Sequence, residues 1–330
     1  MITTVSTSGG AQVAVFALPT RTMYSGLRVS WLSYLGAAEQ RRAAELPTPV
    51  GAVSYLSTQA LMRSMAACRL GVASSAAHTI EVDRTCTLCN STKPHGKPRI
   101  EGMNFNMSQV SSLAVGGFCP DDAQVLGVDL EPRRDRLFPG FARVALSLRE
   151  REIYEATTGE ARNLLGVALW TAKEAVLKAT GHGLSVSPAA VRVFFSDSLT
   201  DQLAEAFEAS RESADEEVTA ASVCSARAVF TVPSRDNSDT TEERSFYITW
   251  TALTLHPEKQ PAHNSPQSTN PAHGSDVAAE QFLLATATEG VPNSVHVHPV
   301  ATPVELRNNL APLTFSQLPA MRMGADPVTA

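Results

Sequence analysis

Two short stretches decide how this chain folds and what it can do: GVDLE at residues 127–131 and WTAKEAVLK at residues 170–178. Apolar and acidic residues alternate in GVDLE, which predicts a β-strand. Side chains at i and i+2 of a strand share one face, so Asp129 and Glu131 should project together. Two carboxylates held side by side on a rigid strand suit a hard divalent cation such as Mg²⁺.

The longer stretch belongs to a helix predicted over residues 161–179, with glycines at its C-terminal end. One face of this helix presents Lys173, Glu174 and Lys178, and the opposite face is apolar. Taken separately, the two stretches could be solvated strand carboxylates and a surface ion pair on a helix. Together, three carboxylates and a lysine are equipment for phosphoryl transfer, which depends on positioning and charge neutralisation.

Composition indicates a globular chain that does not bind nucleic acid nonspecifically. The 330 residues are enough for two lobes or domains, and the net charge is −6. No run of residues approaches the roughly 18 apolar positions of a membrane span. The N-terminus lacks the basic region of a secretory signal, and the odd number of scattered cysteines argues against a disulfide framework. We therefore expect a cytoplasmic protein that does not associate with membranes.

Hydrophobic periodicity predicts further elements along the chain. We expect a helix over about 50–70, a helix over 203–210, and strands near 112–115, 125–130, 191–195 and 246–255. Residues 256–276 are rich in Pro, His, Asn and Ser, which is typical of a flexible insertion. Beyond about residue 306 we expect a poorly ordered tail.

The two stretches together resemble the 4′-phosphopantetheinyl transferases of the type that activates peptide and polyketide synthases. The family pattern is a strand ending G-[IV]-D-[IVL]-E and a helix carrying W-x-x-K-E-[AS]-x-x-K followed by a glycine. The resemblance spans roughly residues 32–195, with a looser match in the strands after 246. It implies an α/β (α+β) fold with two similar lobes in pseudo-twofold arrangement and the active site between the lobes.

This resemblance also implies a division of the chain. Residues 1–120 would form an N-terminal lobe with the coenzyme A nucleotide contacts. Residues 121–305 would form a C-terminal lobe with the metal and catalytic residues, interrupted by the flexible insertion at 256–276. Residues 306–330 would be the poorly ordered tail.

Several site residues follow from the same resemblance. A G-K-P block that helps to hold the nucleotide is matched upstream, and Gln109 replaces a histidine that normally contacts a coenzyme A phosphate. Glutamine can still donate a hydrogen bond but carries no charge. Two arginines fall roughly where the family has basic residues near the 3′-phosphate. The implied coenzyme A contacts are Arg41, Arg42, Gly96, Lys97, Pro98, Ser108, Gln109 and Lys178.

The metal ligands implied by the resemblance are Asp129, Glu131 and Glu174. The implied catalytic residues are Glu150, Glu174 and Lys178; Glu150 lies in a segment similar to L-S-x-x-E, whose glutamate is proposed as an acid/base or orienting group.

The implied reaction uses Mg²⁺, or Mn²⁺ in its place, on the pyrophosphate of coenzyme A. A serine hydroxyl of an acyl or peptidyl carrier protein attacks the β-phosphate, and 3′,5′-ADP leaves. The partners would be coenzyme A and a carrier protein, without nucleic acid or membrane, and two lobes in one chain make a monomer sufficient. The arginines at 133, 134 and 136 would suit docking of an acidic carrier-protein helix.

Other readings stay open at this point. A degenerate relative could bind coenzyme A or a carrier protein without transfer, a reading motivated by Gln109 and Ser54. A metal-dependent nuclease also uses D-x-E with a downstream Glu and Lys, although the chain shows no basic surface. Cys86 and Cys89 with His95 nearby lack a convincing fourth zinc ligand.

Overall fold

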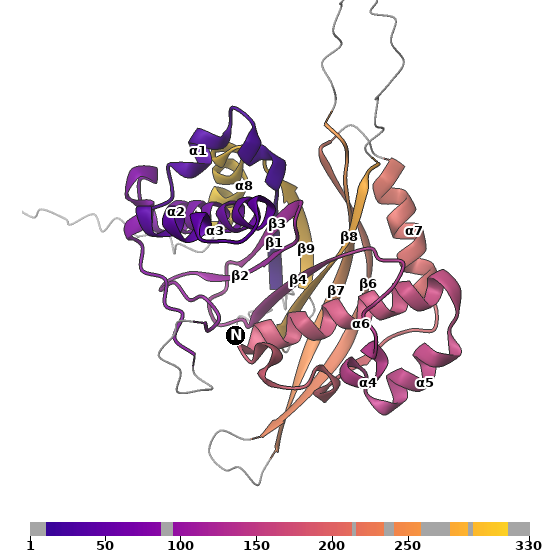
Figure 1. Ribbon diagram of the computed structural model, residues 1–330. Coiled ribbons are helices and arrows are strands. Elements are labelled where there is room, and N and C mark those ends of the chain that lie inside the picture. The colour runs from indigo at the N-terminus through magenta and orange to yellow at the C-terminus, as the bar shows by residue number, and fades with distance from the viewer. Residues whose placement is uncertain are drawn as a thin grey trace, which may run out of the picture.

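The computed structural model describes residues 11–86, 95–212, 216–233, 241–258, 278–289 and 293–315 (Figure 1). The strands are β1 (Ala11–Pro19), β2 (Asn104–Gln109), β3 (Leu113–Cys119), β4 (Leu126–Pro132), β5 (Val191–Phe194), β6 (Val218–Pro233), β7 (Thr241–Leu255), β8 (Glu280–Glu289) and β9 (Asn293–Pro299). The helices are α1 (Arg28–Leu32), α2 (Ala37–Ala44), α3 (Pro49–Leu70), α4 (Phe141–Ala145), α5 (Leu148–Ala156), α6 (Gly159–Thr180), α7 (Leu199–Glu212) and α8 (Pro303–Phe315). Short 3-10 turns are η1 (Thr20–Tyr24), η2 (Ser74–Thr79), η3 (Gly183–Ser185) and η4 (Pro188–Ala190).

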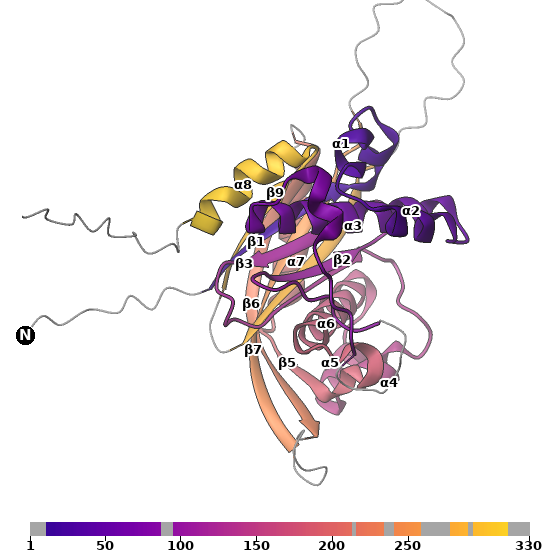
Figure 2. The same ribbon diagram turned by 90° about the vertical axis from the view of Figure 1, so that its left-hand side faces the viewer.

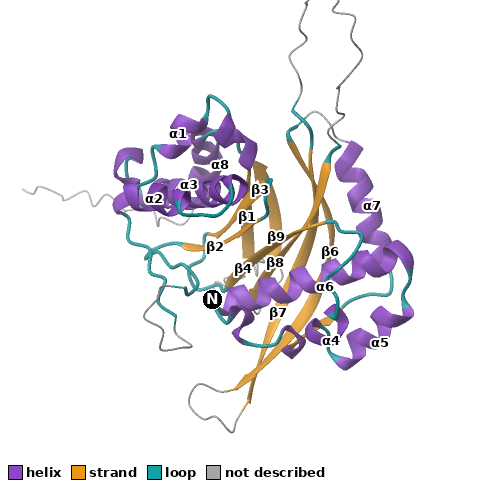
Figure 3. Ribbon diagram, viewed as in Figure 1, coloured by secondary structure: helices purple, strands orange, loops and turns teal. Residues whose placement is uncertain are grey.

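The strands form two sheets, with helices on the outer side of each (Figure 3). The first sheet has the order β2-β3-β1-β9 and the second has the order β4-β8-β7-β6-β5. This mixed α+β architecture confirms the expected fold class, while the pseudo-twofold relation of two lobes stays an expectation. No helix within the described ranges is long and apolar enough to cross a membrane.

Successive side chains of a strand point to opposite faces of its sheet, so the buried residues form three core layers. On β1, Phe16 and Leu18 pack with α3 and α8, while Val13 and Val15 face the second sheet. Opposite them, Val128 of β4 belongs to the core that lies between the sheets. The other face of the second sheet packs against α6 and α7. Each sheet therefore buries one face under helices and the other face against its neighbour.

Both long helices have clear start and stop signals. Helix α3 begins where Thr48 Oγ1 accepts a hydrogen bond from the Gly51 amide at 3.1 Å. It ends at Gly71, whose φ of 67° is a left-handed conformation that glycine adopts without a steric penalty. Helix α6 ends in the same way at Gly181. The helices predicted over 50–70 and 161–179 are confirmed.

The C-terminal part of the chain packs with a different sheet from the one that the expected division into lobes assigns to it. Strand β9 pairs in parallel with β1, and α8 packs against α3 (Figure 2). Residues 293–315 therefore belong with the first sheet rather than with a lobe over 121–305. The expected tail from 306 begins inside α8, because Leu306 and Leu310 are buried in the first core. Residues 316–330, Cys89 and most of the expected insertion at 256–276 lie outside the described residues.

Strand β4 and helix α6 approach so closely that position 127 requires glycine. A Cβ atom on Gly127 would lie 1.9 Å from the carbonyl oxygen of Ala175 and 2.6 Å from the amide nitrogen of Ala179. Asp129 follows on the same strand, and Glu174 immediately precedes Ala175 on the helix. This backbone contact therefore brings the two sequence stretches together.

Replacing Gly127 by alanine should destabilise the protein strongly. We expect the free energy of unfolding to fall by about 3 kcal/mol or more, because the new methyl group would overlap backbone atoms that cannot move independently. Urea unfolding followed by circular dichroism measures the change. Gly26→Ala is the matched control, since no heavy atom lies within 4 Å of its added Cβ. Equal stability of the two variants would contradict the close contact.

Candidate active site

The carboxylate side chains of β4 and α6 meet β2 and α3 in one pocket of about 350 Å³, called here the carboxylate pocket. It lies where β2 of the first sheet approaches β4 of the second (Figure 1). The lining residues are Thr58, Met107, Ser108, Gln109, Asp129, Leu130, Glu131, Trp170, Glu174, Lys178 and Leu184. Residues distant in the sequence thus share one pocket.

Asp129 and Glu174 each offer one carboxylate oxygen that the protein does not use. Oδ1 of Asp129 accepts hydrogen bonds from Lys178 Nζ at 2.6 Å and from Ser108 Oγ at 3.1 Å. Asp129 Oδ2 and Glu174 Oε1 are buried without a hydrogen-bond partner among the described residues. A buried acceptor without a partner is costly. Two such hard oxygens on residues that line one pocket fit a divalent cation such as Mg²⁺.

Glu131 is held differently from the other two carboxylates. Its Oε1 accepts from the indole Nε1 of Trp170 at 2.9 Å, and its Oε2 pairs with Arg134 at 3.1 Å. The indole is fixed edge-on by the rings of Phe138 and Phe141. Both oxygens of Glu131 are therefore occupied. Within the described ranges, no three His, Cys, Asp or Glu side chains are gathered as a metal-binding group.

The pocket makes Glu174 and Glu131 hard to ionise. Burial raises the pKa of Glu174 from 4.5 to about 7; the charge of Asp129 adds to the increase and Lys178 opposes it. Burial and the charge of Asp129 also raise the pKa of Glu131. The Lys178 ammonium does not compensate for three carboxylates. A bound cation would favour the ionised form of each of them.

Glu150 lies in a buried ion pair away from the carboxylate pocket. Lys173 Nζ donates to its Oε2 at 2.8 Å and to its Oε1 at 3.0 Å. The amides of Ser147 and Val193 also donate to Glu150, each at 2.8 Å. Burial lowers the pKa of Lys173, and the Glu150 charge opposes that change. These contacts tie α5, α6 and β5 together, which is the setting of a structural ion pair.

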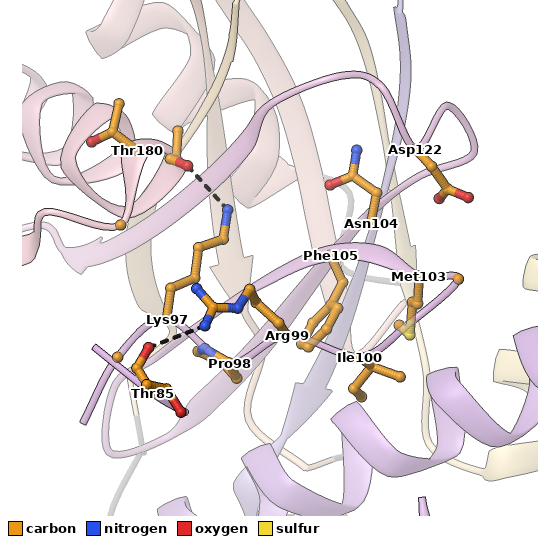
Figure 4. A pocket seen from close by; sticks show the side chains of 14 residues that line it. Thr85, Lys97, Pro98, Arg99, Ile100, Met103, Asn104, Phe105, Asp122 and Thr180 are labelled. Carbon is orange, nitrogen blue, oxygen red and sulfur yellow. Dashed lines mark hydrogen bonds between the residues drawn. The ribbon is translucent and has the colours of Figure 1, made fainter. Parts of the chain in front are cut away.

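The G-K-P segment lines two further pockets beside the carboxylate pocket. The first, of about 470 Å³, contains Arg99, which donates to the Thr85 carbonyl (Figure 4). The second, of about 680 Å³, extends to residues 181–186 and shares Met107, Lys178 and Leu184 with the carboxylate pocket.

Lys97 lines both of these pockets and is hydrogen-bonded to β4 and α6, the two elements that carry the candidate metal ligands. Its Nζ donates to the carbonyls of Leu126 at 2.8 Å and Ala179 at 3.1 Å, so it joins the start of β4 to the end of α6. Burial, and then the charge of Arg99, lowers its pKa to about 8. Gly96 is required for close approach, because a Cβ there would lie 2.5 Å from the Thr85 carbonyl oxygen. Pro98 follows on the same pocket wall.

The remaining predicted contacts divide into two groups. Ser108 and Gln109 line the carboxylate pocket, and Gln109 Oε1 accepts a hydrogen bond from the Thr58 hydroxyl. Arg41 and Arg42 lie exposed on α2, where Arg42 pairs with Glu45 at 3.2 Å. Neither arginine lines the carboxylate pocket or the two pockets beside it.

Sequence reasoning missed the part played by Asn106. Its Oδ1 accepts a hydrogen bond from the Val128 amide of β4 at 3.0 Å. The available signal was the spacing of Asn106 and Ser108, two polar residues at i and i+2 of a strand on which the apolar Phe105 and Met107 alternate with them.

Comparison with known families agrees with this geometry. Residues 125–215 match the family model of the 4′-phosphopantetheinyl transferase superfamily. The matched segment holds Asp129, Glu131, Glu174 and Lys178, and it confirms the resemblance inferred from the two stretches. Over residues 125–215 the chain is therefore similar to this superfamily. No curated protein matches the chain.

The raised pKa of Glu174 predicts a pH dependence of stability in metal-free protein. Between pH 4.5 and about 7, folded Glu174 retains a proton that the unfolded chain has lost. The contribution of this group to the free energy of unfolding therefore falls as pH rises through that window. Glu174→Gln cannot titrate, so it should lose this slope. Urea unfolding at several pH values in EDTA measures both proteins, and identical pH slopes would contradict the assignment.

Proposed function

We propose that the protein transfers 4′-phosphopantetheine from coenzyme A to a serine hydroxyl of an apo acyl or peptidyl carrier protein, as a Mg²⁺-dependent holo-[carrier-protein] synthase. The observation that carries the proposal is the pair of buried oxygens, Asp129 Oδ2 and Glu174 Oε1, that have no partner in the described part of the chain and belong to residues of the pocket that also contains Lys178. In the reaction, the serine oxygen forms a bond to the β-phosphorus of coenzyme A. The bond from that phosphorus to the oxygen of 3′,5′-ADP breaks.

Asp129 and Glu174 would hold Mg²⁺, or Mn²⁺ in its place. Glu131 would join them once Arg134 releases it, since Arg134 is half exposed and can turn toward solvent. When bound, the cation would supply positive charge to the pyrophosphate oxygens.

Lys178 is suited to neutralise charge on the substrate. A lysine ammonium has three N–H donors. Two of them are directed to Asp129 and Ser108. The third N–H is available for a phosphate oxygen of coenzyme A, where it would stabilise charge that develops on the leaving group.

The 680 Å³ pocket supports coenzyme A as the substrate. Its volume is within the range of small-molecule sites. It is continuous with the carboxylate pocket through Met107, Lys178 and Leu184, so one extended ligand can reach both. Its walls include Gly96, Lys97 and Pro98, as expected for the nucleotide end. The exposed Gln109 amide would contact a phosphate by hydrogen bonding alone.

An arginine-rich segment that follows β4 supports a carrier protein as the acceptor. Its arginines are Arg133, Arg134, Arg136, Arg143 and Arg149. Residues 132–149 contain one acidic residue, Asp135, although the whole chain has a net charge of −6. Phe138, Val144 and Leu148 are exposed among these arginines, at 43%, 47% and 77%. Such a segment suits an acidic partner with an apolar face, and Arg134 connects it to Glu131.

A transfer assay tests the proposed function. Purified protein, Mg²⁺, coenzyme A and a set of apo carrier proteins should give carriers with the added mass of phosphopantetheine. Asp129→Asn and Glu174→Gln should lower kcat/KM at least about 100-fold, because each removes charge from the candidate metal site. Circular dichroism should show an unchanged fold. Glu205→Gln, on the exposed side of α7, is the matched control and should keep full activity.

The same assay tests whether the arginine-rich segment binds the carrier protein. Arg149→Glu should raise the KM for the carrier and leave the KM for coenzyme A unchanged, with Arg28→Glu on exposed α1 as its control. Full activity of Asp129→Asn or Glu174→Gln would remove that residue from the site. If no carrier gains mass, the transferase proposal fails.

A relative that binds coenzyme A or a carrier protein without transfer is the second candidate. The neutral Gln109 in the carboxylate pocket favours it. Calorimetric binding of coenzyme A without transfer to any carrier would support this candidate. The grouping of Asp129, Glu174 and Lys178 with unused oxygens favours the enzyme.

A further inference from the structure

Strand β4 lies at the edge of the second sheet, so one side of its backbone has no adjacent strand in that sheet. Buried amides on that side need acceptors from elsewhere. The Val128 amide donates to Asn106 Oδ1 at 3.0 Å, and the Leu130 amide donates to Ser108 Oγ at 3.2 Å. Two side chains of β2 thus take the place that carbonyl groups of a further strand would occupy.

Asn106 and Ser108 join the two sheets at the carboxylate pocket. They lie two residues apart on β2, an edge strand of the first sheet, and project from the same face. Both are buried, at 3% and 7% exposure. Because each side chain binds one particular amide of β4, the pair fixes the register of the two edge strands.

Ser108 makes two contacts that Asn106 Oδ1 does not make. Its Oγ donates to Asp129 Oδ1 at 3.1 Å and accepts from Lys178 Nζ at 2.9 Å. Together with the Leu130 amide, these bonds use the one donor and both acceptor positions of the hydroxyl. Ser108 could therefore contact a coenzyme A phosphate only by giving up one of these bonds.

We propose that Ser108 is a positioning residue, whose hydroxyl holds Asp129 and Lys178 in place relative to the first sheet. The proposal rests on the proposed function, since the cation that Asp129 would bind is the one that transfer requires. Binding through Oδ1 restricts rotation of the Asp129 carboxylate and leaves Oδ2 as the oxygen without a partner among the described residues. Groups that orient a metal ligand in this way typically change metal affinity by about 10–100-fold when removed.

Asn106→Ala and Ser108→Ala form a matched pair for the test. Each removes one acceptor from a β4 amide, so both should lower the Tm by about 2–4 °C. Only Ser108→Ala should raise the Kd for Mg²⁺ measured by calorimetry, by about ten-fold or more. Asn106→Ala should keep an Mg²⁺ affinity within about two-fold of wild type. Ser108→Thr retains the hydroxyl and should keep the wild-type Mg²⁺ affinity. Equal Mg²⁺ affinities of the two alanine variants would overturn the proposal.

A metal-free double-mutant cycle separates this proposal from the proposed function. In EDTA, the Tm changes of Ser108→Ala and Asp129→Asn should be non-additive, because the two residues are hydrogen-bonded. Those of Asn106→Ala and Asp129→Asn should be additive. A wild-type protein that neither binds Mg²⁺ nor transfers would refute the proposed function. The cycle would still show whether Ser108 and Asp129 interact in the metal-free protein. Additive Tm changes in both pairs of variants would overturn the role of Ser108.

Discussion

The backbone contact between β4 and α6 at Gly127 is the constraint on which the candidate site depends. A side chain at this position would overlap the Ala175 carbonyl, so the strand crosses the helix with no side chain between them. Asp129 lies two residues further along β4, and Glu174 lies next to Ala175. The contact therefore fixes the separation of these two carboxylates, and Lys97 reinforces it by binding carbonyls at the start of β4 and the end of α6.

The cost of this arrangement is electrostatic. Burial and mutual repulsion raise the pKa of Glu174 and of Glu131, and Asp129 contributes to both shifts. Lys178 and Arg134 relieve part of the repulsion. Two carboxylate oxygens are buried without a partner among the residues that the structure describes, so a cation can remove a cost that the folded protein otherwise carries. The Glu150–Lys173 pair differs in this respect, because both oxygens of that carboxylate are hydrogen-bonded within the protein.

Sequence patterns predicted the elements and residues whose signal is local. Helical spacing and terminal glycines identified α3 and α6, and alternation identified β4. The pattern on these elements grouped Asp129, Glu174 and Lys178, which the structure brings into one pocket. The position of β9 and α8 beside the first sheet was missed, since pairing between distant segments leaves no periodic signal. The contacts of Glu150 with Lys173 on another helix could not be predicted from its sequence context, and its catalytic role stays a prediction.

The central claim is that Asp129 and Glu174 form one cation site, in which ionisation of Glu174 is suppressed until the cation binds. Calorimetric titration with Mg²⁺ near pH 6.5, repeated in buffers of different ionisation enthalpy, tests it most directly. The account predicts a single site and release of a substantial fraction of one proton, because Glu174 has a pKa of about 7 before binding. Glu174→Gln should abolish the proton release. Binding without proton release, or no binding to the wild-type protein, would contradict the account.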